Sequence, residues 1–241
     1  MHYAFCDCRI PSSALSSLEA LGFLPVLLPP HRALRESAVA SHTDIILFSL
    51  GDLSVVSKKY IEDNPKVYSY LNLAFGKSNV ILSGAEAKEG YPAEAAFNAL
   101  RIGSRLFFRP NDIAPEIPRL SEKKGLSLHH VRQGYPACVT LGVSDSAAIT
   151  SDCGMARAMR SAGVDVLLIG DSQNIKLPPY SNGFLGGAAG SYKDDIFFVG
   201  DLSCHPEHNT IEDFIESHGK RAISLMPEEG SLYDVGGILF I

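Results

Sequence analysis

The cysteines and histidines are the side chains of this sequence that could do covalent chemistry. Cys138 is the candidate nucleophile, because a thiolate beside a basic group attacks electrophilic carbon near neutral pH. The candidate bases are His42, His129, His130 and His205. We pair His205 with Cys138 as the candidate catalytic residues. The alternative is that Cys138 is a buried structural thiol, since free cysteine behaves as a small apolar residue.

Two cysteine-containing segments could instead hold a metal ion. Cys6 and Cys8 form a C-x-C pair, which could bind an ion with Cys153, Cys204 or His205. Segment 204–208 contains several potential ligands, but its proline and the helix predicted after it favour a turn and cap. The usual zinc spacing of two C-x2-C pairs is absent. The five cysteines, an odd number, argue for reduced thiols. We therefore expect no metal and no cofactor.

Asp7 and Arg9 are two residues apart, near the end of a strand predicted over residues 3–8. They share one face if the strand continues, because side chains alternate along a strand. The two could form an ion pair, or Arg9 could hold the carboxylate of a ligand.

The glycines Gly183, Gly186, Gly187 and Gly190 are spaced like those of a nucleotide-binding loop. Such a loop must enter a helix, whose N-terminus holds the phosphate. Here the chain enters a strand predicted over residues 196–199 instead. The glycines therefore indicate tight turns and a close approach of backbones.

Internal repeats predict the elements that position these residues. Residues 90–93 and 134–137 share the sequence Gly-Tyr-Pro-Ala, and each is followed by two apolar runs, a helix-like stretch and a closing strand. In the first of these copies the opening apolar run is 95–100. A third copy begins at Gly186, and a weaker one covers 42–70, with its first strand over 45–48. The fifth is formed if the chain is read as a circle, with a first strand at 238–241, a second at 3–8, a helix over 11–21 and a third strand at 23–28.

Local signals agree with this division of the chain. Gly22, Gly125 and Gly163 are predicted helix stops, and Asp152 is a predicted helix cap. Residues 164–169 are apolar without alternation, which predicts a fully buried strand. Two stretches fall outside the repeat: 71–90, which contains a further strand at 79–82, and the loop 171–183, expected over one end of the ring. We expect one domain covering 1–241.

The five-unit order, with Gly-Gly opening a strand pair, resembles the pentein or guanidine-group-modifying superfamily. More narrowly, the segments at 7–11, 132–138, 148–152, 164–169 and 183–188 resemble an uncharacterised bacterial family assigned to that fold. The resemblance implies a five-bladed, pseudo-fivefold α/β propeller, closed by the N- and C-terminal strands. It also implies a cysteine, a histidine and two carboxylates at the ring axis. In the superfamily that cysteine follows a C-terminal Gly-Gly strand, whereas this sequence reads Gly236-Gly237-Ile238-Leu239-Phe240-Ile241.

Pseudosymmetry then predicts that the residues opening the first strands face the axis. These are His42, Asp44, Tyr91, Glu94, Tyr135, Cys138, Gly186, Gly187 and Asp234. A pocket lined by Asp44, Glu94 and Asp234 would be anionic and suited to a cationic ligand.

Composition excludes several classes of partner. The chain has 241 residues, 21 basic and 27 acidic, for a net charge of −6, so it offers no basic surface for nucleic acid. Its apolar runs are shorter than the roughly 18 residues of a membrane span, and we expect a cytoplasmic protein.

The main hypothesis for the function is a module that binds a small cationic or zwitterionic ligand. The alternatives are a Cys138-dependent hydrolase or transferase of guanidino or amidino compounds, and a protein-interaction ring.

Overall fold

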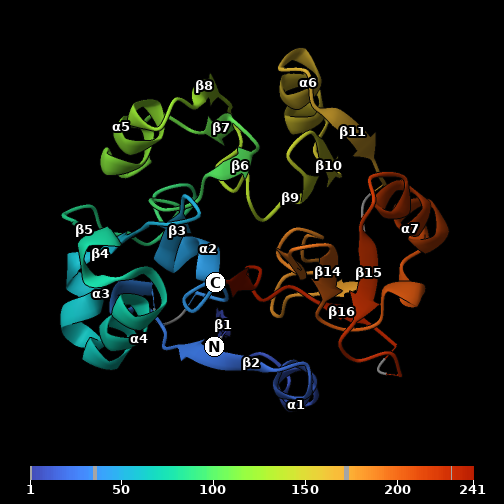
Figure 1. Cartoon of the computed structure of the whole chain (residues 1–241), viewed down its shortest axis with the longest axis horizontal. Coiled ribbons are helices and arrows are strands. Elements are labelled where there is room, and N and C mark those ends of the chain that lie inside the picture. The colour runs from blue at the N-terminus through green and yellow to red at the C-terminus, as the bar shows by residue number, and fades with distance from the viewer. Residues whose placement is uncertain (1, 35–36, 171–173, 229) are drawn as a thin grey trace.

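The described part of the chain contains five three-stranded sheets of the same internal order. The computed structural model describes residues 2–34, 37–170, 174–228 and 230–241. In each sheet a first strand pairs antiparallel with a second, and the second pairs parallel with a third. Figure 1 shows these units following one another around a common centre.

The sheets, each given from first to third strand, are β17 (Leu239–Phe240), β1 (His2–Asp7) and β2 (Phe23–Leu28); β3 (Leu47–Ser49), β4 (Ser54–Ser57) and β5 (Val80–Ser83); β6 (Leu100–Ile102), β7 (Arg105–Phe108) and β8 (Ser127–His130); β9 (Thr140–Ser144), β10 (Ala147–Thr150) and β11 (Asp165–Leu168); and β13 (Ala189–Tyr192), β14 (Asp195–Phe198) and β15 (Arg221–Ser224). A small parallel pair joins β12 (Ile175–Lys176) to β16 (Leu232–Tyr233).

Helices connect the second strand of each sheet to the third. They are α1 (Ser12–Ala20), α3 (Lys58–Asp63) with α4 (Pro65–Phe75), α5 (Glu116–Lys123), α6 (Cys153–Ser161) and α7 (His208–Ser217). The short helix α2 (Thr43–Ile46) precedes β3, and 3-10 turns cover Arg32–Leu34, Lys77–Asn79 and Leu202–Cys204. None of the helices in the described part of the chain is long and apolar enough to cross a membrane.

The two predicted ends of α6 are confirmed. The Asp152 side chain accepts a hydrogen bond from the Met155 amide at 2.7 Å, which satisfies a free donor at the start of α6. Gly163 follows α6 with a φ of 77°, a left-handed conformation that glycine adopts without a steric penalty.

Four predicted strands need correction. The strand expected outside the repeat at 79–82 is β5, which pairs parallel with β4 as the third strand of its own sheet. The run at 95–100 forms turns instead, and its strand begins only at Leu100. Residues 45–48 were expected to be extended, but 43–46 form the helical turn α2. β11 is only partly buried, because it lies at the edge of its sheet.

The two ends of the chain are joined by strand pairing. Ala4 of β1 lies opposite Phe240 of β17, and the Tyr3 amide donates to the Ile241 carbonyl at 2.8 Å. Phe240 also packs against the rings of Phe23 and Phe197, with centroids 4.7 and 5.1 Å away. Pairing and aromatic packing therefore fix the C-terminal strand, so that the segment preceding it is held at the centre of the molecule (Figure 1).

Candidate functional site

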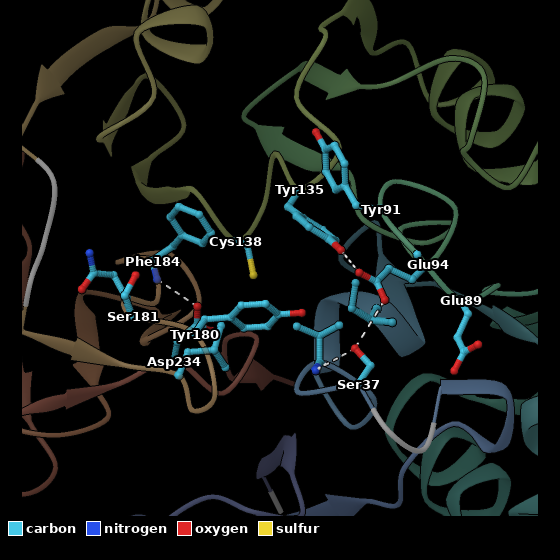
Figure 2. Close-up of a pocket in the computed structure, with 15 residues that line it drawn as sticks. Ser37, Glu89, Tyr91, Glu94, Tyr135, Cys138, Tyr180, Ser181, Phe184 and Asp234 are labelled. Atoms are coloured by element: carbon cyan, nitrogen blue, oxygen red, sulfur yellow. Dashed lines mark hydrogen bonds between the residues drawn. The ribbon is translucent and has the colours of Figure 1, made fainter.

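A cavity of about 570 Å³ lies where segments from several of the units converge. Its walls come from the segments before β3, β6, β9, β13 and β17, and from the loop after β12. In Figure 2, Glu94 and Tyr135 lie on one side, Asp234 and Phe184 on the other, and Cys138 between them. The Tyr180 ring extends across the space between the two sides. The volume suits a small organic ligand.

Glu94 forms the first wall. Its side chain is buried, and one carboxylate oxygen accepts a hydrogen bond from the Tyr135 hydroxyl. The other accepts from the Ser37 hydroxyl at 3.4 Å. Burial and the adjacent Glu94 raise the pKa of Tyr135, so its hydroxyl remains a donor. The ring of Tyr91 lies 5.2 Å from that of Tyr135 and is exposed at the cavity rim.

Asp234 forms the opposite wall. Its carboxylate accepts hydrogen bonds from the Phe184 amide at 2.9 Å and the Gly236 amide at 3.0 Å. Burial raises the pKa of Asp234 to about 6. A Cβ on Gly183 or Gly187 would collide with this side chain, so both glycines are required by the close approach.

Gly186 and Gly187 act through their backbones. The Gly187 amide donates to the Cys138 carbonyl at 3.0 Å, and its carbonyl accepts from the amides of Val235 and Gly237. A Cβ on Gly186 would collide with the Cys138 carbonyl oxygen. The prediction of tight backbone packing at these glycines is therefore confirmed, and they bring the β9, β13 and β17 segments together.

Cys138 lines the cavity, but its surroundings oppose activation. The residue is 4% exposed. Burial raises the pKa of its thiol well above the usual value, and the carboxylates of Asp44 and Asp234 raise it further. A nucleophilic cysteine needs a positive or basic environment. This one has an acidic, desolvated environment and stays protonated near neutral pH.

His42, rather than His205, is the predicted base that lies near Cys138. A ring nitrogen of His42 lies within 4.8 Å of the thiol, and burial lowers the pKa of His42 to about 3. His205 follows a 3-10 turn before α7, where its Nδ1 accepts from the Glu207 amide at 3.0 Å. It does not line the cavity, so the pairing of Cys138 with His205 is wrong. The reason is that His205 lies in the short link between the 3-10 turn at Leu202–Cys204 and α7.

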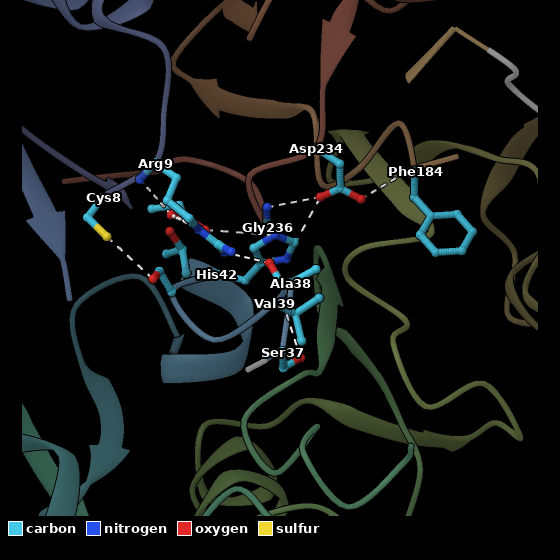
Figure 3. A network of polar contacts seen from close by, with 12 residues as sticks. Cys8, Arg9, Ser37, Ala38, Val39, His42, Phe184, Asp234 and Gly236 are labelled. Atoms are coloured by element: carbon cyan, nitrogen blue, oxygen red, sulfur yellow. Dashed lines mark hydrogen bonds and ion pairs between the residues drawn. The ribbon is translucent and has the colours of Figure 1, made fainter. Parts of the chain in front are cut away.

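Asp7 and Arg9 form the predicted ion pair. The Arg9 guanidinium holds both carboxylate oxygens of Asp7, at 3.0 and 2.6 Å. The pair lines a smaller cavity of about 250 Å³, which also includes His42. Figure 3 shows Arg9, His42 and Asp234 in sequence across this part of the molecule.

Asp44 does not line the main cavity, in contrast to the expected acidic trio. It faces a separate hollow of about 320 Å³ beside β3, β6 and β17. Both of its carboxylate oxygens are buried; the side chains of Cys138 and Asn98 lie beside them, but no described residue makes a hydrogen bond of good geometry to either oxygen. Burial raises the pKa of Asp44 to about 7. The cavity acids are therefore Glu94, Asp234 and the exposed Glu89 at the rim.

Several cavity residues lie outside the repeated motif and were missed. Tyr180, Ser181 and Phe184 come from the loop after β12. Residues 171–173 of the loop predicted over one end of the ring lie outside the described residues. The remainder, including Leu177 and Tyr180, lines the cavity. The two consecutive prolines before Tyr180 were the available signal for a structured loop.

Comparison with known structures gives the fold. The chain is similar to a dimethylarginine dimethylaminohydrolase solved as an adduct with S-methyl-L-thiocitrulline, with 11% identity, a TM-score of 0.59, and 95% and 92% of the two chains covered. It is similar to an agmatine deiminase from C. jejuni, with 10% identity, a TM-score of 0.54, and 93% and 87% covered. It is also similar to SxtG, an amidinotransferase from Microseira wollei, with 11% identity, a TM-score of 0.53, and 93% and 77% covered.

These structures share the pentein fold, and the likeness shows that this chain has a pentein-like α/β fold. A comparison with the curated proteins gave no match. A family model, in contrast, matches nearly the whole chain, at residues 5–239. The chain belongs to the family of unknown function DUF6873.

Proposed function

We propose that the cavity binds a small guanidino or amino compound, either a cation or a zwitterion, without using a cysteine nucleophile. The observation that carries this proposal is the charge of the lining. Glu94 and Asp234 face the cavity from opposite sides, and no lysine or arginine is present among its described lining residues. A cation entering this space would meet carboxylates and no repulsive charge.

The aromatic lining supports the same class of ligand. Tyr91, Tyr135, Tyr180 and Phe184 surround the space, and the faces of such rings attract cations. Solved structures of this fold hold related compounds, S-methyl-L-thiocitrulline in one and citrulline in another. We infer that the binding group of the ligand is a guanidinium or ammonium, with Glu94 as its principal partner.

We further propose that the five sheets are the blades of a pseudo-fivefold propeller whose centre holds this cavity. The segment before each first strand would then lie at the centre, which accounts for the origin of Glu94, Cys138 and Asp234 in different units. Binding rather than turnover is supported by the buried, protonated thiol of Cys138.

The test is calorimetric titration of the purified chain with agmatine, arginine, methylated arginines, polyamines and citrulline, in buffer containing EDTA. We expect a cationic compound to bind and to be recovered unchanged. Citrulline should bind more weakly, because its neutral urea group gains less from a carboxylate. Glu94→Gln should weaken binding about 10- to 100-fold, as expected for loss of a hydrogen bond to a charged group.

Glu89→Gln is the matched control, because Glu89 is exposed at the rim of the same cavity. It should change the affinity less than threefold, roughly the effect of a solvent-exposed charge. Equal effects of the two substitutions would contradict the proposal, and so would the absence of binding by every compound. Turnover that disappears in Cys138→Ala would instead support the Cys138-dependent enzyme.

A further inference from the structure

His42 is a buried histidine whose ring nitrogens are not satisfied by the protein. The residue is 1% exposed, and within the described ranges neither nitrogen has a hydrogen-bond partner. Nδ1 lies 3.9 Å from an Asp234 oxygen, and Nε2 lies 3.8 Å from an Asp7 oxygen. Both distances are too long for hydrogen bonds. A buried polar atom left without a partner is destabilising, so the arrangement needs an explanation.

Two further metal-binding atoms lie beside this ring. A nitrogen of His42, the sulfur of Cys138 and a carboxylate oxygen of Asp234 all lie within 4.8 Å of one another, and all three residues are buried. Imidazole, thiolate and carboxylate are the usual ligands of zinc. With zinc–ligand bonds of about 2.0–2.3 Å, tetrahedral ligand atoms lie roughly 3.3–3.8 Å apart. Small side-chain movements would therefore close the group around one ion.

The surroundings support the ligands as an outer shell would. The carboxylate of Asp7 faces Nε2 of the His42 ring, and it accepts hydrogen bonds from Nε and Nη2 of Arg9. A carboxylate hydrogen-bonded to the second ring nitrogen commonly orients a metal-binding histidine, and a small shift of the ring would close the 3.8 Å gap between Nε2 and Asp7. The amides of Phe184 and Gly236 fix the carboxylate of Asp234. Arg9, His42 and Asp234 follow one another across Figure 3.

We propose that His42, Cys138 and Asp234 bind one divalent transition-metal ion, with zinc as the best match to the three ligand types. On binding, the Cys138 thiol releases its proton to solvent, while His42 binds as a neutral ring. One thiolate and one carboxylate balance the two charges of the ion, so the ion and its three ligands together carry no net charge. Cys138 and Asp234 both line the main cavity, and a fourth position would therefore open toward it.

The inference goes beyond the proposed function and does not rest on it. The ion would lie beside Asp234, and Glu94 on the opposite wall would remain available for a cationic group. The two ideas can also fail separately. Ligand binding is measured with EDTA present and depends on Glu94, whereas metal binding is measured without any organic ligand.

The experiment is titration of the metal-free full chain with Co²⁺, followed by displacement with Zn²⁺. We expect one equivalent of Co²⁺ to produce a thiolate-to-cobalt charge-transfer band and the visible absorption of a tetrahedral site. Cys138→Ser, which is nearly isosteric, should abolish the band. Asp234→Asn should lower the zinc affinity by more than the roughly 10- to 100-fold loss that follows removal of an outer-shell partner.

Cys153→Ser is the matched control, because Cys153 is an exposed free thiol. Its titration should match that of the unmodified chain. Circular dichroism of each variant shows that it is folded. Two results would overturn the proposal: no stoichiometric band in the unmodified chain, or a band that persists in Cys138→Ser and is lost in Cys8→Ser. The second result would assign the metal to the C-x-C pair near the N-terminus.

Discussion

Asp44→Asn tests whether this chain keeps a destabilising carboxyl group at its centre. Both carboxylate oxygens of Asp44 are buried, and no described residue makes a hydrogen bond of good geometry to either of them. Burial raises the pKa of Asp44 from the usual 3.8 to about 7. The folded protein therefore holds a proton on Asp44 that the unfolded chain loses above pH 4.

The sign of the effect on stability follows from proton binding. Between about pH 4 and pH 7 the folded state binds more protons at Asp44 than the unfolded state does. The free energy of unfolding must therefore fall as the pH rises through this window. The difference between 3.8 and about 7 corresponds to on the order of 4 kcal/mol, fully expressed above the folded-state pKa.

Asparagine cannot ionise, so Asp44→Asn removes this pH dependence. At pH 8 the variant should be more stable than the unmodified chain. Part of the gain is offset because the new amide, if unsatisfied, costs about 1–3 kcal/mol. That offset is the same at every pH. The difference in the free energy of unfolding between Asp44→Asn and the unmodified chain should therefore change by about 4 kcal/mol between pH 4 and pH 8, whether or not the new amide is hydrogen-bonded.

The assay is urea unfolding from pH 4 to pH 8 in EDTA, followed by circular dichroism or by the fluorescence of the nine tyrosines, since the chain has no tryptophan. Asp52→Asn is the control. Asp52 is exposed and pairs with Lys124 at 2.5 Å, which lowers its pKa, so its removal should give no gain at high pH. If Asp44→Asn and the unmodified chain lose stability in parallel as the pH rises, the reasoning about Asp44 is wrong.

Two further predictions follow from the same region. Iodoacetamide should modify the exposed Cys153 well before Cys138, because Cys138 is buried and the pKa of its thiol is raised. Peptide mass mapping measures the order of modification. Equal or faster modification of Cys138 would indicate an activated thiol. Gly187→Ala should lower the free energy of unfolding by about 1–3 kcal/mol, because its new Cβ collides with Asp234. Gly84→Ala, which meets open space, is the control in urea unfolding, and equal losses in the two variants would contradict the collision.

Local patterns in the sequence were enough to predict the order of the elements and several residues of the site. Apolar runs, caps and glycine stops are local signals, so they located α1, the end of α5, both ends of α6 and the start of α7 closely. The shared Gly-Tyr-Pro-Ala motif marked equivalent positions in two units, and it led to Tyr91, Glu94, Tyr135 and Cys138, which all line the cavity. The circular reading of the termini was confirmed by the pairing of β1 with β17.

Which of these residues come into contact depends on how the units pack together. Alternation along an extended segment would place His42 and Asp44 on one face, but Asp44 lies in the helical turn over 43–46, which His42 precedes. Asp44 faces a hollow beside β3, β6 and β17 and has Cys138 as a neighbour, whereas the His42 ring lies between Asp7 and Asp234. His205 is kept away from Cys138 by its place in the turn before α7.

The loop that carries Tyr180 and Phe184 reaches the cavity only because β12 pairs with β16, more than 50 residues away in sequence. Contacts of this kind depend on long-range packing between units, which no local pattern of residues encodes. Local chemistry therefore predicted the parts of the site, and the packing of the five sheets determined their arrangement.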